Sequence, residues 1–305
     1  MTEVLVTEVG PRDGLQNEKA LIPTEAKIAF VDGLTAAGHR QIEVSSFVRP
    51  DRVPALADAE DVFRGIIRRP GVRYVGLVAN QRGLERAQGV DCDTIAVFTA
   101  TSKAFTLSNI GMNVQDSLSR YAALTRAAHA GGLGVRGYVS TVFACPHDGP
   151  TRPEDVLRVV EALLAMGCYE VSLGDTTGVG TPTQVRRLLD TLVPRLGADQ
   201  IALHLHDTWG MAIANALTTL EYGVRRFDAS AGGLGGCPFA RGASGNLATE
   251  DLLHLLHESG FETGVDLRMV ASAASRLADS LPHPLYSRVH AALRAQDDEF
   301  GGTSC

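Results

Sequence analysis

Cysteine is scarce in this sequence, and its few cysteines are scattered. The 305 residues include five cysteines, at positions 92, 145, 168, 237 and 305, and none of them forms a Cys-x-x-Cys motif. Disulfide frameworks and structural zinc sites need paired or clustered cysteines. The spacing therefore argues against both.

Long apolar runs and an excess of basic residues are also lacking. No stretch reaches the roughly 18 consecutive apolar residues that a membrane-spanning helix needs. The first residues, Met1-Thr2-Glu3-Val4, lack the basic and apolar regions of a secretory or transit peptide. The net charge of −7 disfavours nucleic-acid binding, which needs a basic face. We therefore expect a cytoplasmic protein with no membrane and no nucleic-acid partner.

Short β-rich segments alternate with segments of helical periodicity along the whole chain. The eight predicted strands are 4–9, 41–46, 73–79, 94–100, 135–143, 169–175, 201–206 and 226–230, and the helical segments between them include 24–37, 114–130, 153–166, 182–196 and 212–222. This alternation requires parallel pairing with right-handed crossovers, and eight strands close a (β/α)8 TIM barrel. An open doubly wound sheet is the alternative, but no Gly-x-Gly-x-x-Gly motif follows the first strand.

No linker or break in composition divides the chain. A barrel of this class occupies about 250 residues, so the length suits one domain. We predict a single catalytic domain over residues 1–296, with at least one extra C-terminal helix near 267–280. The segment 297–305 is acidic and then glycine-rich, and we expect a flexible tail there.

The polar residues that could carry chemistry follow the predicted strands. In such barrels the active site lies at the carboxyl ends of the strands. Arg12, Asp13 and Gln16 follow the first strand, Glu43 and Ser46 lie on the second, Asp175 ends the sixth, and His204 and His206 end the seventh.

His204 and His206 point to the same side of a strand, because side chains two residues apart share a face. The seventh, eighth and first strands are neighbours in a closed barrel, so Asp13 and Asn246 can converge on the two histidines. Two imidazoles, a carboxylate and an amide leave room for further oxygen ligands on Mg²⁺ or Mn²⁺. The alternative is a pair of histidines that are only hydrogen-bonded at a strand end.

Three further charged residues have two interpretations each. Arg12 can neutralise a substrate carboxylate or an enolate oxygen, or it can form a structural ion pair. Glu43 on an inward-facing strand needs a partner, which we expect to be Arg12 or the metal site. Asp175 can orient substrate or a metal-bound water, or it can cap the next helix.

The segment 232–246 places Cys237 and Pro238 in a glycine-dense loop. Glycine permits backbone conformations that let such a loop close over a site, while proline stiffens it. The loop can deliver the thiol to a substrate. It can also be a plain connector with an incidental cysteine.

Together these motifs resemble the 3-hydroxy-3-methylglutaryl-CoA lyase family over residues 4–281. The residues that carry the resemblance are EVGPRDGLQNE at 8–18, IEVSSFV at 42–48, SLGDT at 172–176, HLHDT at 204–208 and the segment from the Cys237 loop to 251. The first and fourth motifs also resemble a wider superfamily that includes isopropylmalate synthases, homocitrate synthases and carboxyltransferase domains. The Cys237 loop, followed by GNLATED at 245–251, is more particular to the lyases.

The resemblance implies a (β/α)8 barrel, a divalent cation, and cleavage of an acyl-CoA substrate to acetyl-CoA and acetoacetate. It implies metal ligation by Asp13, His204, His206 and Asn246 and catalytic roles for Arg12, Glu43, Asp175 and Cys237.

In a retro-Claisen cleavage, Arg12 would stabilise the enolate and the Cys237 thiol would protonate it. His204 is the better-placed candidate to take the hydroxyl proton and Asp175 is the other, and the sequence does not separate these two. We assign substrate binding to Arg12, Gln16 and Ser46, and we expect a homo-oligomer, with a dimer favoured.

Trp209, Met211 and Lys103 depart from the family's common pattern, which has tyrosine, glutamine and an acidic residue at these positions. Residues around the acyl pocket decide which branched 3-hydroxyacyl-CoA the enzyme accepts, so these departures leave the identity of the substrate open. The alternatives are therefore a lyase for another such thioester, an acyl-CoA-dependent 2-oxo-acid synthase, and a barrel without catalytic activity.

Overall fold

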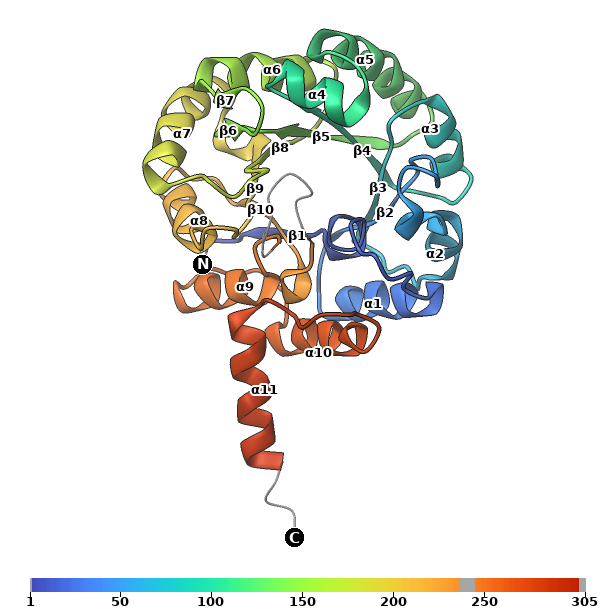
Figure 1. The fold of residues 1–305 in the computed structure, drawn as a ribbon, viewed down its shortest axis with the longest axis vertical. Coiled ribbons are helices and arrows are strands. Elements are labelled where there is room, and N and C mark those ends of the chain that lie inside the picture. Colours follow the sequence, from blue (N-terminus) through green and yellow to red (C-terminus); the bar gives the residue numbers. More distant parts are fainter. Residues whose placement is uncertain (1, 236–244, 302–305) are drawn as a thin grey trace.

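Eight parallel strands close into a barrel surrounded by helices, in a computed structural model that describes residues 2–235 and 245–301 (Figure 1). The strands are β1 (Leu5–Glu8), β2 (Gln41–Ser46), β3 (Arg73–Leu77), β4 (Thr94–Ala100), β5 (Gly134–Ser140), β8 (Val171–Gly174), β9 (Ile201–His204) and β10 (Arg226–Ala229). β1 closes the ring by pairing in parallel with β10. The predicted (β/α)8 fold is confirmed.

The helices cover the outside of the barrel and connect consecutive strands (Figure 1). They are α1 (Thr24–Ala36), α2 (Ala59–Gly65), α3 (Gln81–Gln88), α4 (Lys103–Ile110), α5 (Val114–Ala130), α6 (Pro153–Ala165), α7 (Pro182–Leu196), α8 (Ala212–Glu221) and α9 (Thr249–Glu258). α7 shows why these segments are helical. Its buried side chains, Val185, Leu188, Leu189 and Leu192, form one apolar stripe, and the Thr181 N–H donates to Gln184 Oε1 at 3.0 Å in a capping box.

The fifth predicted strand was too long at its carboxyl end. β5 stops at Ser140 because Thr141 adopts a left-handed backbone conformation, with φ of 61°. The chain then forms a short antiparallel hairpin, β6 (Ala144–Cys145) with β7 (Gly149–Pro150), that the periodicity of the sequence did not indicate.

Two further helices, α10 (Leu267–Ala278) and α11 (Arg288–Gly301), follow the barrel, and α11 projects away from it (Figure 1). α10 lies where an extra helix was predicted. α11 continues past residue 297, where we expected a flexible tail, and Arg268 on α10 donates to Asp297 at 3.2 Å. No helix in the described ranges combines the length and apolar character needed to cross a membrane.

Candidate active site

A cavity of about 860 Å³ opens at the carboxyl ends of the barrel strands. Its wall includes six side chains that the sequence analysis selected, namely Arg12, Asp13, Gln16, Ser46, His204 and His206. Residues separated by up to about two hundred positions in the sequence therefore meet in one cavity.

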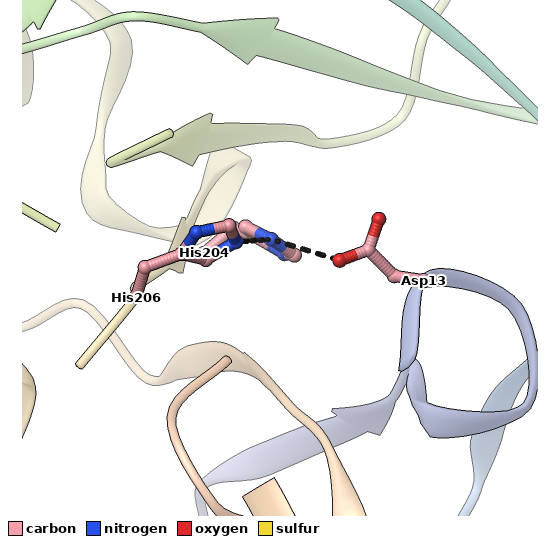
Figure 2. A group of neighbouring side chains, drawn as sticks. All are labelled: Asp13, His204 and His206. Atoms are coloured by element: carbon pink, nitrogen blue, oxygen red, sulfur yellow. Dashed lines mark hydrogen bonds and ion pairs between the residues drawn. The ribbon is translucent and has the colours of Figure 1, made fainter. Parts of the chain in front are cut away.

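Asp13 and the two histidines form a compact cluster on this wall. Asp13 lies in the π-helical turn η1 (Gly10–Gly14) directly after β1, and His204 is the last residue of β9. Nε2 of His204 lies 3.2 Å from Nε2 of His206 and 3.7 Å from Oδ2 of Asp13. Figure 2 shows the carboxylate and the two imidazole rings turned toward one another. These three residues could hold a metal ion.

The protonation states of Asp13 and His206 suit a cation. For His204, burial lowers the pKa, but Asp228 and Asp13 outweigh burial and raise the pKa above its ordinary value. Burial lowers the pKa of His206 to about 4, so its imidazole is neutral near pH 7. Burial alone would raise the pKa of Asp13, but the Arg12 charge and the histidines lower it to about 2. A carboxylate and a neutral imidazole are the forms that bind metal ions.

Asn246 lies beside these residues, as the metal prediction required. Its backbone pairs with that of His206 in an isolated antiparallel β-bridge. Its side-chain Nδ2 donates to Oδ2 of Asp13 at 2.9 Å and to the Leu234 carbonyl at 3.0 Å. Its buried Oδ1 accepts no hydrogen bond from any residue of the described ranges. An amide oxygen is therefore available next to the carboxylate.

Arg12 is held in place by two carboxylates. One Nη donates to Oε2 of Glu43 at 2.6 Å, and the other contacts Asp13. The Tyr138 hydroxyl donates to the same Glu43 oxygen at 3.0 Å. The expected pairing of Glu43 with Arg12 is thus present, and it presents the guanidinium to the cavity.

Asp175 is turned toward its own loop. Its carboxylate accepts a hydrogen bond from the Gly180 N–H at 2.9 Å, while its neighbours Gly174 and Thr176 line the cavity. Burial raises the pKa of Asp175 to about 6. This contact orders the loop before α7, and the helix cap that the sequence offered as the alternative is made by Thr181 instead.

The other predicted residues are placed as follows. Gln16 donates to Oδ1 of Asp13 at 3.1 Å, and Oγ of Ser46 accepts from the Val48 N–H at 3.3 Å. Cys237, for which a catalytic role was expected, lies outside the described residues.

Sequence reasoning missed a buried polar group behind this wall. Arg136 and Tyr138 on β5, Ser172 on β8 and Asp228 on β10 are joined by hydrogen bonds inside the barrel. A charged residue within a strand that is otherwise buried is the pattern that could have revealed Arg136 and Asp228.

Comparisons with known proteins show what this chain is similar to. The HMGL-like family model matches residues 3–277. The chain is 46% identical over 296 residues to the hydroxymethylglutaryl-CoA lyase of Pseudomonas mevalonii, covering 97% of this chain and 98% of that protein. It is also 46% identical over 294 residues to the 3-hydroxy-3-isohexenylglutaryl-CoA/hydroxy-methylglutaryl-CoA lyase of Pseudomonas aeruginosa, covering 96% and 98%.

Two solved structures extend this similarity to three dimensions. The hydroxymethylglutaryl-CoA lyase from Pseudomonas aeruginosa superimposes with a TM-score of 0.95 at 46% identity, covering 97% of this chain and 98% of that chain. An HMG-CoA lyase from Acenitobacter baumannii, in complex with coenzyme A and 3-methylmalate, has a TM-score of 0.90 at 38% identity, covering 95% and 94%. The match extends over nearly the whole chain, and we conclude that this chain belongs to the hydroxymethylglutaryl-CoA lyase family.

Proposed function

We propose that this enzyme cleaves 3-hydroxy-3-methylglutaryl-CoA to acetyl-CoA and acetoacetate in a retro-Claisen reaction that depends on a divalent metal ion. The observation that carries the proposal is the cluster of Asp13, His204 and His206 on the cavity wall, with Arg12 in contact with Asp13. The names of the relatives and the coenzyme A complex of one of them support an acyl-CoA substrate.

Asp13, His204 and His206, with Asn246 as a fourth ligand, would hold Mg²⁺ or Mn²⁺. Mixed imidazole and oxygen ligands favour Mn²⁺ of the two. When bound, the cation would lower the pKa of the substrate's tertiary hydroxyl group by Lewis acidity.

Arg12 would stabilise the enolate that leaves when the carbon–carbon bond breaks. Each Nη of Arg12 contacts one carboxylate, Glu43 or Asp13, and carries a second N–H group. A donor that is already oriented stabilises developing charge without reorganisation. We therefore assign the Arg12 guanidinium, which lines the cavity, to the enolate oxygen.

We assign acceptance of the hydroxyl proton to Asp175 in preference to His204. Nδ1 of His204 lies 3.2 Å from Asp228, so only Nε2 faces the cavity, and one nitrogen cannot bind a cation and accept a proton at once. Asp175 is flanked in the sequence by two cavity-lining residues, and its carboxylate, which accepts from the Gly180 N–H, would turn toward the cavity to act. A base with a pKa of about 6 is suited to proton transfer near neutral pH.

Two further roles complete the proposal. An ordinary cysteine thiol has a pKa near 8.5 and is mostly protonated at pH 7, so Cys237 would donate the proton to the enolate carbon. Gln16 and Ser46, which line the cavity, would contact substrate. The homodimer and the cytoplasmic location stay predictions, which light scattering and cell fractionation would test.

A second candidate is a lyase for a thioester with a longer branch at carbon 3. Val48, Leu77 and Phe98 form an apolar part of the cavity wall, and β3, which carries Leu77, lies across the barrel from β9. The Pseudomonas aeruginosa relative is named for both an isohexenylglutaryl and a methylglutaryl thioester.

A panel of 3-hydroxyacyl-CoA esters, assayed for acetyl-CoA release by mass spectrometry, tests the proposal. We expect the highest kcat/KM with the methylglutaryl thioester. A higher value with a longer branch would establish the second candidate. Failure to release acetyl-CoA from every ester would overturn both.

A further inference from the structure

Arg136 is a fully buried cation that lies behind the cavity wall. Its Nε donates to Glu170 at 2.6 Å, and one Nη donates to the Tyr138 hydroxyl at 2.5 Å. Its two Nη groups donate to the two oxygens of Asp228, at 2.6 and 3.2 Å. It is 0% exposed and does not line the cavity, so it acts through the residues that it holds.

Asp228 connects this cation to His204. Its Oδ2 accepts a hydrogen bond from the Ser172 hydroxyl at 2.7 Å and lies 3.2 Å from Nδ1 of His204. A carboxylate bound by a guanidinium only accepts hydrogen bonds. The proton of a neutral His204 ring must therefore sit on Nδ1, which leaves the lone pair on Nε2.

We propose that Asp228, held by Arg136, is a positioning residue that fixes His204 in the Nδ1-protonated tautomer and so directs the Nε2 lone pair toward Asp13 and His206. The proposal deepens the proposed function, because that lone pair is the one assigned to the cation. The tautomer itself is a property of the protein without metal, so it can be measured independently.

The same guanidinium reaches the other half of the site. The Tyr138 hydroxyl accepts from Arg136 and donates to Glu43, which accepts from Arg12. Arg136 thus orients both the ring assigned to the cation and the guanidinium assigned to the enolate. Burial of a charge is costly without partners, and two of the three partners of Arg136, Asp228 and Tyr138, connect it to the site.

Replacement of Asp228 by asparagine tests the tautomer directly. The Arg136 guanidinium can only donate hydrogen bonds, so the amide oxygen of the new side chain must take the place of Oδ1 of Asp228, 2.6 Å from an Nη of Arg136. The amide N–H₂ then takes the Oδ2 position, beside His204, Ser172 and the other Nη of Arg136, and Nδ1 of His204 must accept. We expect D228N to move the ring proton to Nε2 and to weaken Mn²⁺ binding by about 10- to 100-fold, the usual effect of losing such a partner.

Nitrogen-15 NMR of metal-free protein with labelled histidine reads the tautomer, with the His204 signals assigned by their loss in His204→Gln. Mn²⁺ affinity is measured by titration calorimetry. Asp58→Asn is the matched control, since it also breaks an ion pair of a buried cation, Lys27 at 2.7 Å, on the outer helices. We expect that control to lower stability and to leave the tautomer and the Mn²⁺ affinity unchanged.

A wild-type His204 that carries its proton on Nε2 would overturn the inference, whether or not D228N folds. So would a folded D228N protein with the wild-type tautomer and Mn²⁺ affinity. A wild-type protein that has the expected tautomer but binds no Mn²⁺ would instead support the tautomer and contradict the metal part of the proposed function.

Discussion

Arg12 illustrates how single side chains are oriented in this site. Its guanidinium lies between Glu43, which is fully buried, and Asp13, which is part of the cluster assigned to the cation. A planar donor with fixed partners on two sides is restricted to one orientation, and a lysine ammonium at the same position is not.

We expect Arg12→Lys to lower kcat by about 100- to 1,000-fold, because the group acts mainly on charge that develops in the transition state. The KM for the thioester should change only a few-fold. Steady-state kinetics measure both values, and Arg40→Lys, in an exposed ion pair with Glu3, serves as the control. An increase in KM alone would assign Arg12 to substrate binding.

A second single residue, Asp175, determines how we expect kcat/KM to depend on pH. Burial raises this pKa to about 6, and a general base acts only when it is deprotonated. We expect kcat/KM to fall as the pH drops below about 6, and the residual activity of Asp175→Asn to lack this dependence. The same acidic decline in the variant would remove Asp175 as the base.

At the scale of elements, buried glutamates join the turn after β1 to the segment after β10. Oε1 of Glu8 accepts hydrogen bonds from the Gly10 N–H at 2.7 Å and the Ala231 N–H at 3.0 Å. Glu250, in the first turn of α9, accepts from the Gly232 N–H at 2.9 Å. Gly232 needs to be glycine, since its φ is 71° and a Cβ there would meet Leu285 at 2.8 Å.

These glutamates predict how stability depends on pH. Burial raises the pKa of Glu8 to about 7 and of Glu250 to about 8. A raised folded-state pKa means that the folded protein favours the protonated group. This contribution to stability is complete below about pH 4.5 and is lost as the pH rises toward 8.

We therefore expect Glu250→Gln to reduce the loss of unfolding free energy between pH 5 and 8. The reduction should be on the order of a few kcal/mol, since each pKa unit corresponds to about 1.4 kcal/mol. Urea unfolding at several pH values measures it, with Glu258→Gln at the exposed end of α9 as the control. Identical pH profiles for wild type and Glu250→Gln would contradict the prediction.

At the scale of the whole molecule, the barrel brings together ligands from distant parts of the chain. Asp13 follows β1, His204 ends β9 and His206 follows it, with β10 between these two strands. A cation held by them would bind the folded chain and not the unfolded one. Binding of that kind stabilises a protein by about 2.7 kcal/mol at a ligand concentration 100 times the Kd.

We expect Mn²⁺ or Mg²⁺ to raise the Tm by several degrees, and chelation to reverse this shift and abolish acetyl-CoA release. Asp13→Ala should lose the metal-dependent shift, whereas Asp58→Asn should keep it. Differential scanning fluorimetry measures the shift. Full activity in the presence of chelator would exclude a metal requirement.

The sequence alone determined the (β/α)8 architecture and six of the residues that line the cavity. Strand and helix patterns depend on neighbouring residues, so β2 and β4 have the predicted bounds. The active-site motifs follow strand ends, and the fold brings strand ends together wherever they occur in the chain.

Only the tertiary structure decided the partners of these residues. Arg136 meets Asp228 across 92 positions of sequence, Asp175 turns to its own loop, and Thr141 ends β5 earlier than its composition predicts. The physical reason is that burial and hydrogen bonding depend on which groups meet in space. The periodicity of apolar residues indicates which face of a helix or strand is buried, but it does not indicate which residues pack against that face.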